Sequence, residues 1–302
     1  MLLVTGITGH SGKYFLQELI DNSEAVMREV GSIRVLVRSG SDTSQLDACD
    51  IPIDKCVGDI SDEGFLRKAM QGVDTVLHIA GIRFSRVVIA TAIASGVTRI
   101  ILVHTTGVYS KYKSASREYE GIDSEVRSFA DESQVNLTVL RPTMIYGSLR
   151  DRNVSTFIRL VDKLKVVPVV NHARYELQPV HAKDLGTAYY RVLMNPQLTT
   201  NKEYNLSGKN PIMLIDMLKI IEKQLSCKRR YLNVPFLLAY SGAWIIFVLT
   251  LSRVDYREKI QRLCETRVFS HEEASTDFGF APIAYEEGIV AEVDEYRRQK
   301  AK

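Results

Sequence analysis

A chain of 302 residues is long enough for one large domain, or for a domain with a small additional lobe. Hydrophobic residues make up 45% of it and charged residues 25%, which excludes a disordered chain. The net charge of +3 comes without a dense cluster of Lys and Arg, so we expect no nucleic-acid partner. Apolar residues that can form a strand begin at once, so we expect no signal peptide.

The cysteines have neither the spacing of a metal site nor the density of a disulfide framework. They are Cys49, Cys56, Cys227 and Cys264. We therefore expect free thiols in a reducing compartment, no metal site and a cytoplasmic location.

A glycine-rich turn follows the first predicted strand, Leu2–Val4. Its glycines are Gly6, Gly9 and Gly12, and helical apolar spacing runs from Lys13 to Val30. Glycines permit a tight turn and a close approach to a pyrophosphate, while the helix N-terminus offers free N–H groups. Strand, turn and helix together predict a dinucleotide site, the alternative being an ordinary turn.

The stretch Thr5–Gly12 matches the pattern T-G-x-x-G-x-x-G. It resembles the extended and atypical short-chain dehydrogenases/reductases, which include epimerase/dehydratase-like and NmrA-like proteins. The resemblance extends over essentially the whole chain. It implies that the following residues contact the dinucleotide phosphates: Thr5, Gly6, Thr8, Gly9, His10, Ser11 and Gly12.

Arg38 and Ser39 follow the second predicted strand, Ile33–Val37. An acidic residue at this position binds the 2′-hydroxyl of NAD, whereas an arginine accommodates the 2′-phosphate of NADP. The sequence therefore favours NADP(H), with NAD(H) as the alternative. A solvated surface arginine is the other interpretation of Arg38.

Two further strand ends complete the predicted cofactor site. By resemblance, Asp59 and Ile60, at the end of a third strand beginning at Lys55, flank the adenine. Alone, Asp59 is equally compatible with a turn or a helix cap. Ala80 and Gly81 follow the fourth strand and leave space for the ribose and diphosphate. His78, within that strand, is interpreted as a packed histidine.

Strands and helices continue to alternate, which predicts right-handed crossovers and a doubly wound Rossmann-type parallel α/β sheet of six or seven strands. Residues 1–150 are predicted to form the dinucleotide-binding core. Residues 151–302 complete it and form a smaller C-terminal substrate lobe. Later predicted helices span 62–71, 83–95, 116–133, 153–165 and 212–225, with strands at 99–104 and 135–140 and a late strand and turn at 203–208.

The catalytic residues are less well defined. Thr105, Thr106 and Tyr109 follow the fifth strand, where relatives place a hydroxyl that polarises the substrate and a substrate-facing tyrosine. In the family a Tyr-x-x-x-Lys pair follows. Tyr119 stands where the tyrosine is expected, but Asp123 replaces the lysine and would raise the pKa of a nearby phenol. The pattern from Tyr109 to Lys113 is interpreted as coincidental.

Arg141–Gly147 matches the family's Arg-Pro-x-x-x-Tyr-Gly loop. There the resemblance places Pro142, Thr143 and Met144 beside the nicotinamide and Tyr146 on the substrate side. His181, in a later segment, is a substrate-side candidate or a structural residue. Asp184 is predicted to cap the helix that follows.

The segment Phe236–Leu251 contains no charge and is shorter than the ~20 residues that span a bilayer. It predicts a buried or groove-lining helix. The alternative is contact with a membrane surface or an apolar partner, which Arg253, Arg257 and Lys259 favour.

These features favour an NAD(P)-dependent oxidoreductase or epimerase that acts on a carbonyl or carbinol carbon. Nucleotide sugars come first among the substrates, and sterols or other apolar carbonyl compounds second. Because Asp123 replaces the lysine, a non-catalytic NADP(H)-binding sensor or assembly factor is the alternative. A membrane-associated scaffold is a third interpretation, and an oligomer is compatible with all three.

Overall fold

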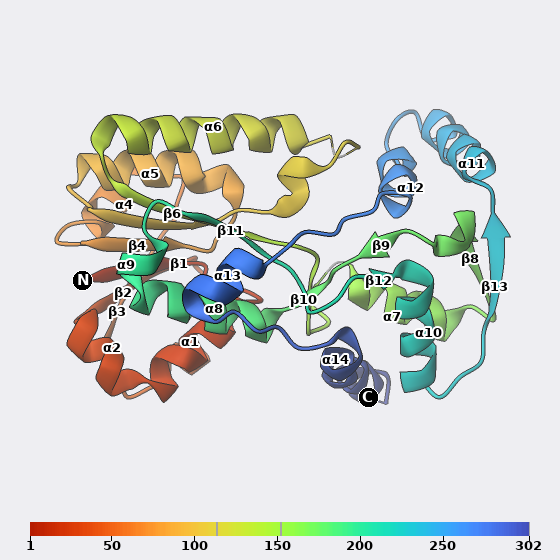
Figure 1. The fold of residues 1–302 in the computed structure, drawn as a ribbon, viewed down its shortest axis with the longest axis horizontal. Helices are drawn as coiled ribbons and strands as arrows, with labels where there is room; N and C mark the ends of the chain where they lie inside the picture. Colours follow the sequence, from red (N-terminus) through yellow and green to blue (C-terminus); the bar gives the residue numbers. More distant parts are fainter. Residues whose placement is uncertain (113, 152, 302) are drawn as a thin grey trace.

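The computed structural model describes residues 1–112, 114–151 and 153–301. A seven-stranded sheet lies at its centre, with the order β11-β6-β5-β4-β1-β2-β3 and every neighbouring pair parallel (Figure 1). The predicted doubly wound sheet is thus confirmed. Its strands are β1 (Leu2–Thr5), β2 (Ile33–Val37), β3 (Ile53–Val57), β4 (Thr75–His78), β5 (Arg99–Val103), β6 (Asn136–Pro142) and β11 (Glu203–Leu206).

Helices cover both faces of this sheet, which explains why its strands are apolar on both sides. Leu2 and Val4 of β1 pack in one hydrophobic cluster and Leu3 in the other, as the alternation of a strand requires. The first cluster includes residues of α1 (Gly12–Asp21), α2 (Ser23–Glu29), α3 (Ser44–Asp47), α8 (Ala182–Met194) and α13 (Glu272–Phe278). The second includes residues of α4 (Glu63–Ala69), α5 (Ser85–Ala94) and α6 (Ser116–Ser133).

The first predicted helix, Lys13–Val30, is wrong as one element. It divides into α1 and α2 at Asn22, whose φ of −118° and ψ of 30° lie outside the helical region. The Asn22 side chain donates to the carbonyl of Glu18 and so satisfies the end of α1. A short polar side chain that bonds its own backbone competes with helix continuation.

The second half of the chain contributes both to the sheet and to a separate lobe (Figure 1). β11 extends the sheet beside β6, and α8 packs on α1. The lobe has its own hydrophobic core, to which α7 (Val154–Lys163), α10 (Leu214–Gln224), α14 (Tyr285–Lys300), β8 (Val166–Val170) and β13 (Arg230–Val234) contribute.

The remaining strands and helices lie outside these hydrophobic cores or contribute few residues to them. They are β7 (Ile145–Tyr146), β9 (Glu176–Leu177), β10 (Val180–His181), β12 (Ile212–Met213), α9 (Pro196–Thr199), α11 (Phe236–Leu249) and α12 (Arg257–Leu263). Three short 3₁₀ turns complete the described elements, η1 (Ile82–Phe84), η2 (Thr106–Tyr109) and η3 (Asn171–Ala173).

The predicted cap of α8 is also wrong. His181, not Asp184, occupies the N-cap position, and its Nδ1 accepts from the amide of Lys183 at 3.1 Å. Asp184 lies within the first turn and accepts instead from the amide of Ile283 at 3.1 Å. Burial raises the pKa of Asp184 to about 6, although the hydrogen bond from Ile283 acts to lower it. Asp184 therefore ties the C-terminal segment to the sheet-covering helix.

Candidate functional site

The glycine turn after β1 has the geometry of a dinucleotide cradle. Gly6 has a φ of +79°, and a Cβ there would lie 2.7 Å from the amide nitrogen of Ala80. A Cβ at Gly9 or Gly12 would lie 2.9 or 2.2 Å from the carbonyl oxygen of Gly6. Only glycine fits at these positions, so α1 can begin directly behind the turn. The exposed Gly9 and the start of α1 directly behind it fit a pyrophosphate.

His78 holds the turn against the loop that follows β4. The Thr5 hydroxyl donates to His78 Nδ1 at 2.7 Å, and His78 Nε2 donates to the carbonyl of Gly81 at 3.0 Å. Complete burial lowers the pKa of His78 to about 4, so the ring is neutral and keeps this one tautomer. Gly81 has a φ of +115° and Ala80 is exposed. His78 is therefore a positioning residue for two cofactor loops.

The residues expected at the adenosine end lie beyond β2 and β3. Arg38 and Ser39 are exposed directly after β2, and Arg38 makes no ion pair with any described residue. The Asp59 carboxylate accepts from the amide of Ser61 at 2.8 Å, as in an Asx turn, while Ile60 is buried. The guanidinium of Arg38 is thus available to an anion.

A cavity of about 360 Å³ contains several of the predicted residues of the catalytic end. Its lining brings together the glycine turn, the segment after β5, the loop after β6 and the lobe. The lining residues are His10, Thr105, Thr106, Gly107, Thr143, Met144, Ile145, Asp151, Asn153, Leu177, Gln178, Arg262 and Arg267. The cavity lies where a doubly wound sheet binds its ligand, at the carboxyl ends of the strands.

The two threonines of this cavity differ in the use of their hydroxyls. Thr106 donates to the carbonyl of Pro142 at 3.3 Å, which joins the ends of β5 and β6. Thr105 accepts from the amide of Gly107 at 3.0 Å, which leaves its own hydroxyl proton for another acceptor. Thr105 is therefore the better placed of the two to donate to a substrate oxygen.

Two arginines from the lobe line the same cavity and were missed by the sequence analysis. Arg262 and Arg267 have buried Nε atoms without a hydrogen-bond partner, and neither makes an ion pair with a described residue. Burial, followed by the charge of Arg262, lowers the pKa of Arg267 to about 10. The charge of Glu265 partly offsets this shift, but Glu265 makes no ion pair with either arginine. Neighbouring cations without an ion pair are suited to an anionic ligand. They lie outside any motif, so only their tertiary position reveals them.

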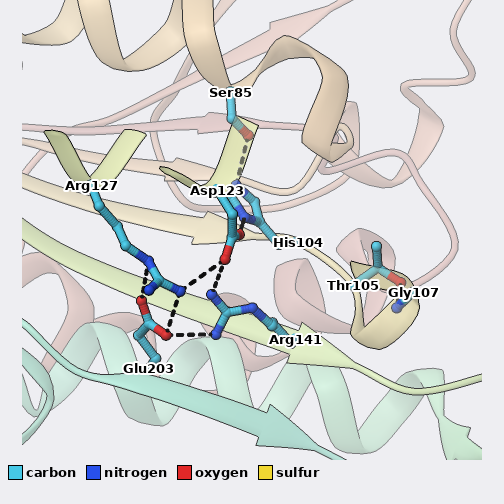
Figure 2. Close-up of polar contacts among 8 residues, drawn as sticks. All are labelled: Ser85, His104, Thr105, Gly107, Asp123, Arg127, Arg141 and Glu203. Carbon is cyan, nitrogen blue, oxygen red and sulfur yellow. Dashed lines mark hydrogen bonds and ion pairs between the residues drawn. The ribbon is translucent and has the colours of Figure 1, made fainter. Parts of the chain in front are cut away.

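Asp123, which replaces the family's lysine, belongs to a buried network of charges (Figure 2). Its carboxylate accepts from His104 Nδ1 and from Arg141, each at 2.5 Å. Arg127 adds a third contact at 2.9 Å, and Glu203 pairs with both arginines. Although burial opposes it, the hydrogen bond from His104 and the charge of Arg141 lower the pKa of Asp123 to about 2.

This network gives Asp123 a structural role. Because the carboxylate is ionised, His104 donates through Nδ1 and accepts at Nε2 from the Ser85 hydroxyl at 3.0 Å. Burial lowers the pKa of His104 and keeps the ring neutral. Figure 2 shows Thr105 on the segment beyond His104, turned away from the network. The network therefore fixes the start of the segment that carries Thr105.

The remaining predicted residues lie around this cavity without lining it. Tyr119 is nearly buried in the layer of α5 and α6, and the Arg83 guanidinium lies 5.5 Å from its ring centre. Tyr109 is 49% exposed on a neighbouring groove that includes Arg141. The pattern from Tyr109 to Lys113 ends outside the described residues.

Tyr146 and His181 pack in the interior. Tyr146 is fully buried, with its ring centre 5.1 Å from that of His181. A Cβ at Gly147 would lie 2.5 Å from His181 Nε2, and one at Gly288 would lie 2.2 Å from the Tyr146 hydroxyl. The lobe encloses Tyr146, and His181 packs between Tyr146 and Tyr14 of α1, so both side chains lie in the interior.

The sequence pattern of the NAD(P)H-binding family matches residues 6–167, more than half of the chain. The chain belongs to this NAD(P)H-binding family. It has the fold of the extended short-chain dehydrogenases/reductases, as the resemblance implied. A dTDP-glucose 4,6-dehydratase, DesIV from Streptomyces venezuelae with NAD and TYD bound, superposes with a TM-score of 0.74. The two share 17% identity over 99% of this chain and 98% of the other, which shows the fold alone.

Two curated relatives come from Arabidopsis thaliana. The chloroplast stem-loop binding protein of 41 kDa b is 27% identical over 55% of this chain and 47% of its own length. The mitochondrial NADH dehydrogenase [ubiquinone] 1 alpha subcomplex subunit 9 is 22% identical over 80% of this chain and 61% of its own length. The chain thus spans between about half and three-fifths of the length of these relatives.

Proposed function

We propose that this family member is an NAD(P)-dependent oxidoreductase or epimerase acting on a carbonyl or carbinol carbon of an anionic substrate, with nucleotide sugars first. The observation that carries this proposal is the cavity that joins Thr105 to the unpaired Arg262 and Arg267. A diphosphate would pair with both half-buried arginines, neither of which makes an ion pair with a described carboxylate. The fold of the nucleotide-sugar dehydratase DesIV supports the same class of substrate.

The chain's own residues would divide the work as follows. The glycine turn and the two loops that His78 holds would bind the dinucleotide, whose nicotinamide supplies or accepts hydride when bound. The Thr105 hydroxyl would donate to the substrate oxygen and hold it in place. Tyr119 remains the predicted proton-transfer residue, with Thr106 as the alternative.

We also propose that NADP(H) is preferred over NAD(H). Arg38 follows β2 on the surface, and its guanidinium is not used by another described side chain. A dianionic 2′-phosphate would gain a charge-assisted hydrogen bond there that a ribose hydroxyl would not. Charge reversal at Arg38 is therefore expected to invert the preference.

The alternative function is a dinucleotide-binding sensor or assembly factor without turnover. It is favoured by the position of Asp123, whose carboxylate is fully engaged by His104 and Arg141. Among the described residues, the cations that contact Asp123 are Arg127 and Arg141 of that network, and no lysine contacts it. This arrangement is compatible with tight cofactor binding and no acid–base chemistry.

A cofactor and substrate assay separates these functions. NADPH and NADH are titrated against the wild type and Arg38→Glu, with Arg28→Glu, an exposed arginine of α2, as the matched control. We expect at least tenfold tighter binding of NADPH, lost only in Arg38→Glu. Equal affinities for both dinucleotides in the wild type would contradict the preference.

Turnover is then tested with UDP- and dTDP-sugars, following nicotinamide absorbance and the configuration of the sugar. Thr105→Val is expected to lower kcat ~100-fold while Thr105→Ser retains activity, because only the hydroxyl is required. Tyr119→Phe tests the predicted proton-transfer residue in the same assay. If the wild type binds the dinucleotide but converts none of these sugars, the sensor function replaces the enzyme.

A further inference from the structure

Helix α11 presents an unusually large apolar surface to solvent. Its fourteen residues all lie in the described part of the chain, and only Ala243 among them is buried. Leu237 is 76% exposed and Leu249 is 77% exposed, and Leu251 just beyond the helix reaches 81%. The sequence-based expectation of a buried helix is therefore wrong, because the helix packs mainly on the short α12. A surface of this kind has a partner.

The exposed residues cover a broad arc of the helix. Those exposed by at least 40% are Leu237, Leu238, Trp244, Ile245, Ile246, Val248 and Leu249. At 3.6 residues per turn they span roughly 200° of the circumference. A helix that enters a protein groove buries a stripe of about 100°. The broader arc fits an apolar medium that surrounds the helix.

Basic residues lie on both sides of this helix in the chain. The segment from Ser226 to Ile260 contains six basic and two acidic side chains, a net charge of +4, against +3 for the entire chain. The rest of the protein is therefore close to neutral. Asp255 is paired with Arg257, and Glu258 accepts from the Ser114 hydroxyl. Four exposed cations make no ion pair with the described residues, namely Lys228, Arg230, Arg253 and Lys259.

The helix is too short to cross a bilayer. Fourteen residues extend ~21 Å, compared with a hydrocarbon core of ~30 Å. In the described part of the chain, every helix falls short of the length and apolarity that crossing requires. Figure 1 shows α11 at the end of the lobe remote from β1, β2 and β3, where the body of the protein does not obstruct a flat surface.

We propose that α11 docks this protein on the surface of an anionic lipid bilayer. The helix lies in the interface, with its exposed arc among the acyl chains and the flanking cations at the headgroups. Trp244, 51% exposed within the arc, lies at the depth that tryptophan favours. Cation–π stacking of Arg257 on Phe247, 3.9 Å from the ring centre, fixes α12 to the opposite side of α11.

Trp244 also supplies the readout, because it is the only tryptophan of the chain. The full chain is mixed with vesicles of phosphatidylcholine alone or with phosphatidylglycerol. We expect co-sedimentation and a blue shift of the tryptophan emission with the anionic vesicles, both weakened by salt. Brominated lipids are expected to quench Trp244. No blue shift and no co-sedimentation with anionic vesicles would overturn the proposal, and so would equal binding to both vesicle types.

Three variants test the residues involved. Ile245→Glu with Leu249→Glu is expected to abolish binding, whereas Leu198→Glu, 49% exposed on α9, is the matched control and leaves it unchanged. Arg253→Gln with Lys259→Gln is expected to weaken binding at least tenfold, since each cation near the surface contributes ~1 kcal/mol. All these positions are exposed, so melting temperatures should stay unchanged.

The oligomeric state tests whether a second copy of the chain, rather than a bilayer, covers α11. Light scattering is measured without lipid for the wild type and the Ile245→Glu variant. A dimer that this substitution dissociates would show that a second copy covers α11, and it would overturn the proposal. A wild type that remains monomeric without lipid supports the bilayer surface.

Discussion

Arginines occur in two places near the catalytic end of this protein, one buried and the other half-buried, and their surroundings differ. Arg141 is 2% exposed and pairs with two carboxylates, those of Asp123 and Glu203. Arg262 and Arg267, which line the cavity, pair with no described carboxylate. The first arrangement is complete within the chain, whereas the second lacks its anion.

The difference separates stability from binding. Removing one partner from a complete buried network leaves an uncompensated charge, which costs stability. Two neighbouring cations without an ion pair already lower the stability of the folded chain. Such an arrangement is typical of a site where a ligand supplies the opposite charge. The first two predictions below address this contrast, and the third extends it to a buried acid.

The largest effect is expected at Asp123. Replacement by asparagine removes the charge that balances Arg141 and leaves one acceptor oxygen for the two donors His104 and Arg141. We expect the free energy of unfolding to fall by about 3–5 kcal/mol, measured by urea denaturation. Glu118→Gln on the same helix is the control, because its pair with Arg83 is exposed and contributes at most ~1 kcal/mol. Equal losses of unfolding free energy in the two variants would contradict the role of Asp123 in a buried network.

Arg267 is expected to behave in the opposite way. Arg267→Gln relieves repulsion from Arg262 and should leave stability unchanged or raise it by up to ~1 kcal/mol. The same variant should weaken the binding of UDP or pyrophosphate at least tenfold, measured by calorimetry. Arg230→Gln, an exposed cation of β13, is the matched control. Unchanged affinity together with lost stability would show that Arg267 is structural.

A pH-dependent effect is expected at Glu292 of α14, a buried acid beside Asp151. Its carboxylate accepts from the amide of Gly147 at 2.8 Å, yet burial, aided by Asp151, raises its pKa to about 10. The folded state thus holds a proton that the unfolded chain releases above about pH 4.3. Stability from this group is complete below that pH and is lost as pH rises through about 10.

Glu292→Gln should therefore reduce the fall in melting temperature between about pH 5 and about pH 9. Glu286→Gln, exposed in the first turn of the same helix, serves as the control and should retain the wild-type pH dependence. Parallel curves for the wild type and Glu292→Gln would show that the buried acid is ionised at neutral pH.

The dinucleotide half was predictable because its requirements are local. A side chain at Gly9 or Gly12 would meet the backbone of Gly6, and Gly6 itself has a φ of +79°, so these constraints lie within the turn. The apolar runs of β1 and β5 are buried on both faces, which their composition already indicated. Arg38 follows β2 directly, so its position depended only on where that strand ends.

The catalytic half depended on contacts between distant segments. In the sequence, Asp123 only marked the absence of the family's lysine. The positions of His104, directly after β5, and of Arg141 on β6 showed that it completes a charge network. Arg262 joins Thr105 in one cavity although more than 150 residues separate them. Sequence spacing carries no information on such pairs, because their proximity is set by how the lobe packs on the sheet.

The sequence by itself determined the class of fold, the dinucleotide turn and the unusual absence of charge between Phe236 and Leu251. Only the tertiary structure decided which side chains are buried, which are exposed and which face a cavity. It buried Tyr146 and His181, exposed the apolar helix α11 and left two arginines facing a cavity. The physical reason is that periodicity fixes local geometry, whereas burial and charge compensation depend on neighbours that are remote in the chain.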